Sequence, residues 1–137
     1  MRVLLLKFCD YACRTEGAKG SIIGIFDTVG GIEFPVSHPT FYICVEFEFD
    51  PFEADRTVEV LMRLINEDGR EILVVEGEIR VPPAFEGRPV NMFEYFRVDG
   101  LIFEVPGPYR LDCLSGEEIL AEARLMLVKG QPPRTFL

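Results

Sequence analysis

The sequence predicts an all-β protein, an antiparallel β-sandwich of about eight strands. Two observations predict this class. Apolar and polar residues alternate with a period of two along most of the chain, as half-buried strands require. Turn-forming residue pairs recur at a spacing that allows about eight strands. The chain has 137 residues, 48% of them hydrophobic, so we expect one domain over residues 1–130 and a flexible tail at 131–137.

The clearest single strand covers residues 41–49. Every odd position in this segment is apolar, whereas Glu46 and Glu48 occupy even positions. Successive side chains of a strand point to opposite faces of the sheet. The segment is therefore predicted to have one face in the core and one face in solvent.

The dipeptide Asp68-Gly69 predicts a hairpin with a two-residue type I′ loop, which would pair Glu67 with Arg70. Continuing that register makes one face apolar on both strands, and a slip by one residue would destroy the match. The expected pairs are Leu64 with Leu73, Met62 with Val75, Val60 with Gly77, and Val58 with Ile79.

Apolar residues also occupy the outer face of this hairpin. They are Leu61, Ile65, Ile72 and Val74, and the segment at 92–96 has apolar residues on both faces in the same way. Either another part of the chain covers such a face or a partner protein binds to it. We take Leu61, Ile65, Ile72 and Val74 as the candidate interaction face.

A second hairpin is expected to close with a three-residue loop at 115–117. In that register Cys113 faces Ile119 and Arg110 faces Glu122, which is a favourable charge pair. The segment from Glu117 to Met126 has a composition that favours helix, but its apolar residues alternate. We predict a strand there, with a helix as the alternative.

Residues 101–111 contain an apolar strand, a Pro-Gly-Pro corner and then Tyr109. Sandwich domains use such a corner to carry the chain between sheets, and the tyrosine hydroxyl bonds back to the corner. This pattern favours an immunoglobulin-like or related Greek-key sandwich.

The charge balance argues against several classes of partner. The chain is acidic, with a net charge of -9 and a pI near 4.6, and its basic residues are scattered, so nucleic-acid phosphates would be repelled. No apolar run reaches the roughly 18 residues of a membrane span. The four cysteines are dispersed without a Cys-x-x-Cys pair, which favours reduced thiols and a cytoplasmic protein.

No set of residues in the sequence predicts catalysis, so we expect no catalytic residue, no cofactor and no metal ligand. His38 is the only histidine and is expected to be a solvated turn residue. One alternative is open at the acidic loop 46–55, where carboxylates could bind Ca²⁺ or serve a metal-dependent enzyme. The carboxylates in that loop are Glu46, Glu48, Asp50, Glu53 and Asp55.

The chain resembles a family of small bacterial proteins of unknown function. Four short motifs carry the resemblance. They are Cys9-Asp10-Tyr11-Ala12, the segment 20–27 with its Gly-x-Phe-Asp end, Pro39-Thr40-Phe41-Tyr42, and the corner with Gly107 and Tyr109. The resemblance implies a β-sandwich of about this length in the bacterial cytoplasm, with no activity or catalytic residue to transfer.

Asp10 and Asp27 lie in otherwise apolar strands, so we expect hydrogen bonds from turn amides to their carboxylates. If they lined a pocket, they would be the first candidates for a site. The expected function is a non-catalytic protein-interaction or assembly module that binds another protein or self-associates. A small-ligand or Ca-binding protein, or a metal-dependent enzyme using loop 46–55, is the alternative.

Overall fold

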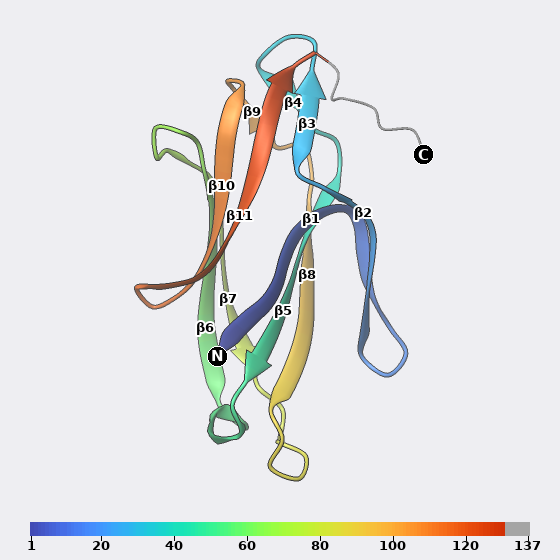
Figure 1. Cartoon of the computed structure of the whole chain (residues 1–137), viewed down its shortest axis with the longest axis vertical. Coiled ribbons are helices and arrows are strands. Elements are labelled where there is room, and N and C mark those ends of the chain that lie inside the picture. The colour runs from blue at the N-terminus through green and yellow to red at the C-terminus, as the bar shows by residue number, and fades with distance from the viewer. Residues whose placement is uncertain (131–137) are drawn as a thin grey trace.

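The computed structural model describes residues 1–130, and the tail expected at 131–137 lies outside the described residues. Two sheets face each other (Figure 1). The first contains β2 (Lys19–Phe26), β1 (Arg2–Thr15), β5 (Phe41–Phe49) and β8 (Val90–Val98), in that order. The second contains β3 (Thr28–Gly31), β11 (Glu118–Lys129), β10 (Gly107–Ser115), β6 (Thr57–Ile65) and β7 (Glu71–Arg80). The predicted β-sandwich is confirmed.

Three short elements complete the described chain. Strands β4 (Val36–Ser37) and β9 (Ile102–Phe103) pair with each other, and a 3-10 turn, η1, covers Pro51–Glu53. Within residues 1–130, no helix has both the length and the apolar character needed to cross a membrane.

The connections between the sheets follow a Greek key. The chain runs from β5 in the first sheet to β6 and β7 in the second, returns to β8 beside β5, and crosses again to β10 and β11. This is the strand order of an immunoglobulin-like sandwich, with β2 added at the edge beside β1. Strand β3 pairs with β11 in parallel, because the chain passes from β2 directly to the second sheet at Asp27 without turning back.

The main core lies between the two sheets. All five odd-numbered residues of β5 are at most 1% exposed, which confirms the alternation predicted for this strand. They form one cluster with leucines of the opposite sheet, among them Leu64, Leu111 and Leu125. Strand β5 therefore supplies three of the six buried aromatic side chains in the described chain, Phe41, Phe47 and Phe49.

The predicted tyrosine corner is confirmed. The Tyr109 hydroxyl donates a hydrogen bond of 2.7 Å to the carbonyl oxygen of Val105, four residues earlier. The Tyr109 ring meets Phe103 edge-on at 5.2 Å between ring centres. These contacts hold the corner where the chain enters β10.

The hairpin of β6 and β7 has the predicted register but not the predicted loop. All four expected apolar pairs are present. The prediction of a two-residue loop is wrong, because the Asn66 amide donates to the Arg70 carbonyl and closes a three-residue loop in which Gly69 has φ +81°. A register shift near Ile72 compensates for the extra loop residue and restores the expected pairing.

The register predicted for β10 and β11 is wrong by two residues. Ser115 pairs with Glu118 across a two-residue loop, and a further register shift places Cys113 opposite Ala121. Arg110 consequently faces Arg124 instead of Glu122. A shift of two residues keeps every side chain on its original face, so the alternation of apolar residues does not distinguish the two registers. The segment is a strand, as expected.

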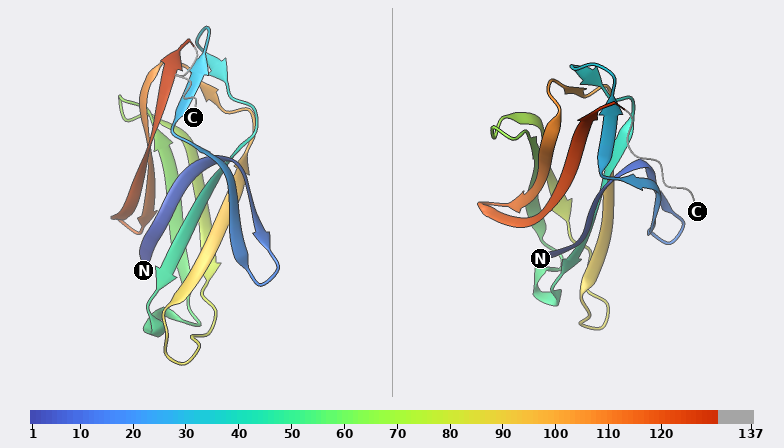
Figure 2. Two further views of the ribbon diagram at one scale, coloured as in Figure 1. Left: turned by 45° about the vertical axis from the view of Figure 1, so that its right-hand side comes forward. Right: turned by 45° about the horizontal axis from the view of Figure 1, so that its top comes forward.

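The β1–β2 hairpin covers part of the outer face of the first sheet. Residues of β1 up to Cys9 pair with β5, whereas residues from Phe8 to Thr15 pair with β2. Both views of Figure 2 show this hairpin on the side of the first sheet away from β10 and β11. Its second half reaches back toward β8, where Gly20 lies against the Phe93 ring.

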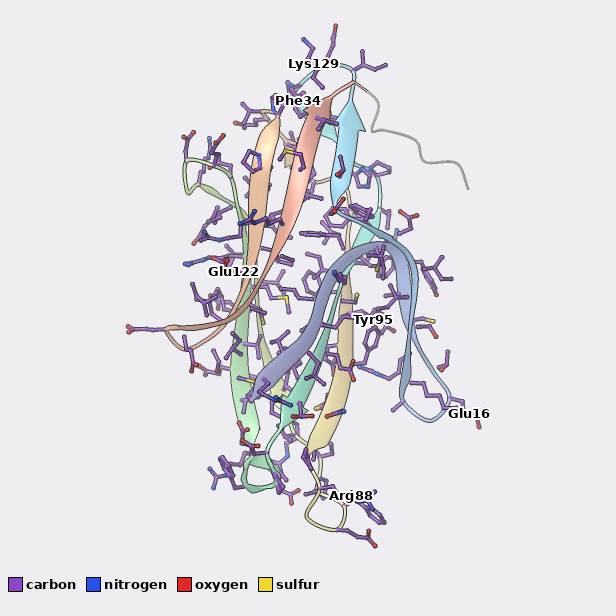
Figure 3. All side chains as sticks on the ribbon, in the orientation of Figure 1. Glu16, Phe34, Arg88, Tyr95, Glu122 and Lys129 are labelled. Carbon is purple, nitrogen blue, oxygen red and sulfur yellow. The ribbon has the colours of Figure 1, made fainter. Side chains whose placement is uncertain are left out.

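A second, smaller core fills the space under this hairpin. Cys9, Ala12 and Cys44 are fully or almost fully buried there, with Phe93 and Tyr95 packed against them. Figure 3 shows Tyr95 between β8 and the hairpin, whose tip carries Glu16. The apolar residues on both faces of 92–96 could be covered by another part of the chain or by a partner protein. The structure supports the first interpretation, since the β1–β2 hairpin covers the second face.

The tyrosine corner makes a prediction about stability. Tyr109→Phe removes the hydroxyl and leaves the Val105 carbonyl without this donor, so we expect the free energy of unfolding to fall by about 1–2 kcal/mol. Urea denaturation followed by circular dichroism measures the change. Tyr95→Phe is the matched control, since no residue in 1–130 bonds the Tyr95 hydroxyl, and an equal loss in both variants would contradict the role of the corner.

The close contact of Gly20 makes a second prediction. A Cβ at this position would lie 2.4 Å from the Phe93 ring, so Gly20→Ala must push the hairpin away from β8 and is expected to cost about 1–3 kcal/mol. Thermal unfolding measures the loss. Gly77→Ala, with nothing within 4 Å of its Cβ, is expected to change stability by less than about 0.5 kcal/mol. Equal stability of the two variants would show that the hairpin is not docked.

Candidate functional site

His38 is not the solvated turn residue that the sequence predicts. Its ring is half-buried and packs against Phe26 at 5.7 Å and Phe41 at 5.5 Å between ring centres. Its backbone amide donates to the Leu101 carbonyl at 3.1 Å. Burial lowers the pKa of His38 below its ordinary value of 6.5, against an opposing effect of the Asp10 charge. The aromatic contacts pack His38 against the ends of β2 and β5.

The acidic loop 46–55 uses its carboxylates for local structure. Glu48 pairs with Arg2, and Glu53 lies 2.6 Å from the amino group of Met1. Glu53 also accepts a hydrogen bond from the Asp50 amide, which caps η1. In the described part of the chain no three side chains of His, Cys, Asp or Glu come together as a metal site would require. The metal site of the alternative hypothesis is therefore not assembled at this loop.

Asp10 and Asp27 are both exposed, and neither has the expected bond from a turn amide in the described structure. The Asp10 carboxylate packs against Gly24, where a Cβ would lie 2.3 Å from one of its oxygens. Asp27 accepts a hydrogen bond of 3.0 Å from the Thr28 hydroxyl. Asp27 lines a groove, which is the condition under which we expected it to belong to a site. Asp10 instead contacts Gly24 within the β1–β2 hairpin.

This groove lies between the loop at 66–69 and the ends of β10 and β11. Its volume is about 750 Å³, and Arg110 and Arg124 project into it from neighbouring strands. A second groove of about 410 Å³ shares Asp27 and Arg124 with the first. The first groove also contains Glu67 and Asp68, so two positive charges meet three negative ones and neither sign of ligand is strongly favoured.

The orientation of Arg110 has a structural cause. Asp112 is completely buried on β10, and its two carboxylate oxygens accept bonds from Arg110 Nε at 2.7 Å and Arg63 Nε at 3.2 Å. A buried carboxylate without such partners would cost several kcal/mol. The ion pairs therefore hold β10 to β6 and keep Arg110 beside the groove. The alternation in the sequence does not reveal this cluster, because it leaves the register of β10 and β11 open and the expected register sets Arg110 opposite Glu122.

The candidate interaction face is only partly formed. Leu61 and Ile65 are half-buried and Val74 is 43% exposed, but Ile72 packs against the main core. The register shift at the hairpin turns Ile72 away from the face on which regular alternation would place it. The four residues therefore do not form one continuous apolar surface.

A more exposed apolar surface lies on β2, which the sequence analysis did not select. Ile23 is 62% exposed and Ile25 is 57% exposed, and Tyr11, the partner of Ile23 on β1, is 47% exposed. Strand β2 stands at the edge of the first sheet and pairs only with β1. The available signal was the absence of any charged residue at 20–26. We call β2 with Tyr11 the β2 edge surface.

Comparison with known proteins gives a family. Residues 4–128 match the sequence profile of a family of unknown function (DUF6941). No curated protein matches the chain.

Two solved structures resemble the fold at low sequence identity. An immunoglobulin-like protein from Pseudomonas aeruginosa is 13% identical with a TM-score of 0.43, covering 93% of this chain and 95% of that one. The alkylpurine DNA glycosylase AlkC from Pseudomonas fluorescens, bound to DNA containing an abasic site analogue, is 12% identical with a TM-score of 0.45. That match covers 89% of this chain, which spans only 30% of the glycosylase. Neither resemblance identifies an activity for this chain.

The packing of His38 predicts a pH dependence of stability. Because its pKa is lower in the folded chain than in the unfolded one, the unfolded state binds more protons as the pH falls below 6.5. The free energy of unfolding is therefore expected to be highest above that pH and to fall between pH 7.5 and 5.5. Urea denaturation across this range measures the slope. His38→Gln is expected to flatten it, and an unchanged slope in that variant would contradict the burial of this ring.

Proposed function

The chain belongs to this family of unknown function (DUF6941), and we propose that it is a non-catalytic module that binds protein through the β2 edge surface. The observation that carries the proposal is the exposure of Ile23 and Ile25 on an edge strand whose residues 20–26 carry no charge. An edge strand offers a row of unpaired backbone N–H and C=O groups to a strand of another chain. Exposed apolar side chains beside that row add affinity and register.

The other edge strands are less suited to this role. β7 carries Glu71, Glu76 and Glu78, and charged side chains on an edge discourage pairing. β8 carries Glu94 and Arg97. β3 is only four residues long. Among the four edges of the two large sheets in residues 1–130, β2 is therefore the one that combines length with an uncharged, exposed apolar segment.

The charge and the cysteine content support two further parts of the proposal, a protein as the partner and the cytoplasm as the compartment. A net charge of -9 disfavours a nucleic acid as the partner. Burial raises the pKa of the Cys44 thiol to about 12 and that of Cys113 to about 11, and all four cysteines are free. Free thiols suit a reducing compartment, so we place the module in the cytoplasm with a protein partner.

The proposal predicts that Ile23→Glu combined with Ile25→Glu abolishes binding without unfolding the chain. Both side chains are exposed, so the core is unaffected, whereas two carboxylates on the edge oppose pairing with another strand. The measurement is affinity purification of the tagged chain from its source, with the molar amount of each co-purified protein, including untagged copies of this chain, determined by mass spectrometry.

Val74→Glu is the matched control, because Val74 is an exposed valine on another edge strand. We expect the native chain and this control to retain a partner at comparable molar amount, and the double variant to lose it. Equal recovery from all three proteins would show that binding does not use the β2 edge surface. A native chain recovered without any stoichiometric partner would refute the proposed function.

A further inference from the structure

An apolar cleft opens between β7 and β8, the strands that end the two large sheets on this side of the sandwich. Its volume is about 150 Å³. The buried side chains of Val45, Phe47, Val60 and Met62 are among its lining residues. We propose that this cleft binds a small aromatic amine, with the ring between the sheets and the ammonium group at the Glu94 carboxylate. This site is separate from the β2 edge surface and does not depend on the function proposed for it.

Gly77 leaves the cleft open. Gly77 pairs with the core residue Val60, so a side chain at this position would point between the sheets, as those of Val75 and Ile79 do. A Cβ at Gly77 would have no heavy atom within 4 Å. The φ angle of Gly77 is not positive, so the backbone does not require a glycine there. The position therefore provides open space, and a glycine inside a strand often marks the close approach of a ligand.

Glu94 brings a charge into this apolar space. It pairs with the core residue Val45, and residues directly opposite each other project to the same face, so Glu94 lies on the inward face of β8. Its neighbours on that face, Met92 and Phe96, pack against the main core. The Glu94 side chain is 36% exposed, and an Arg14 Nη atom lies 3.0 Å from its Oε2. A carboxylate accepts up to about four hydrogen bonds, so one arginine leaves room for a further donor.

Protection of the sheet edge explains only one of these two residues. An inward-pointing charge on an edge strand discourages pairing with another chain, and Glu94 can serve that purpose. That role needs no gap on the facing strand, whereas a glycine at position 77 weakens β7. Both residues line the same cleft, where one provides space and the other provides a charge. The combination fits a ligand with an apolar body and a cationic group.

The volume and the charge of the cleft define the class of ligand. An apolar cavity of roughly 150 Å³ holds one benzene ring, which limits the apolar body to about that size. Two carboxylates, Glu78 and Glu94, line the cleft, and none of its lining residues within 1–130 is basic. Arg14 compensates one of the two charges. Because the whole chain carries a net charge of -9, a cation is attracted to the cleft and an anion is repelled.

A titration with benzylamine and with benzoate tests this proposal. The two compounds carry the same ring and have opposite charges at neutral pH. Amide chemical shifts of the whole chain, followed by NMR, measure binding. We expect benzylamine to shift the amides around Gly77 and Glu94 to saturation and to bind about tenfold more tightly than benzoate. Shifts that rise linearly without saturation, or equal affinities for the two compounds, would overturn the proposal.

Two variants test the roles assigned to the two residues. Gly77→Val fills the cleft without a clash at the Cβ, and Glu94→Gln removes the charge but keeps the size of the side chain. Each is expected to weaken benzylamine binding about tenfold, and Glu94→Gln also to remove the preference over benzoate. Unchanged affinity in either folded variant would overturn the proposal. Glu94→Gln alters a partly exposed side chain and decides the outcome if Gly77→Val does not fold.

Glu76→Gln is the matched control. Glu76 lies on β7 next to Gly77 but does not line the cleft, so this variant changes the net charge by the same amount as Glu94→Gln. We expect it to bind benzylamine as the native chain does. An equal loss of affinity in Glu76→Gln and Glu94→Gln would show that only the net charge matters, and it would overturn the assignment of the site.

Discussion

The arrangement of the molecule depends on the division of β1 between two partners. Its first half extends the main sheet beside β5 and brings Phe8 into the core. Its second half leaves the sandwich with β2, and Gly20 permits the hairpin to close on Phe93 because a side chain there would collide with the ring. This path leaves β2 at the edge of the sheet. It also carries the chain at Asp27 across to the second sheet, where β3 lies parallel to β11.

The parts of the fold that depend on local periodicity could be predicted from the sequence. The five inward residues of β5 and the apolar pairs of β6 and β7 follow from alternation, because a slip of one residue would expose the whole core face. The bond from Tyr109 to Val105 follows from the residues of the corner itself. In each of these places the interaction that determines the structure lies within a few neighbouring residues or within one pair of strands.

The other features of the fold depend on contacts that the alternation of apolar and polar residues does not reveal. A shift of two residues between β10 and β11 preserves the faces, so Arg110 was paired with Glu122 when its partner is Asp112. Ile72 leaves the expected interaction face because of one register shift. The cover over Phe93 and Tyr95 comes from a hairpin more than 60 residues away in the chain, and the exposure of β2 follows from the order of strands in the sheet.

The central claim is that β2 is docked on β1 along one edge and free to pair along the other. Amide hydrogen exchange, measured residue by residue in the isolated chain, tests both halves of this claim. The account predicts that the amides of residues 20–26 that bond to β1 are protected and that the remaining amides of this segment exchange rapidly. Rapid exchange of the whole strand, or protection of both sets of amides, would contradict it.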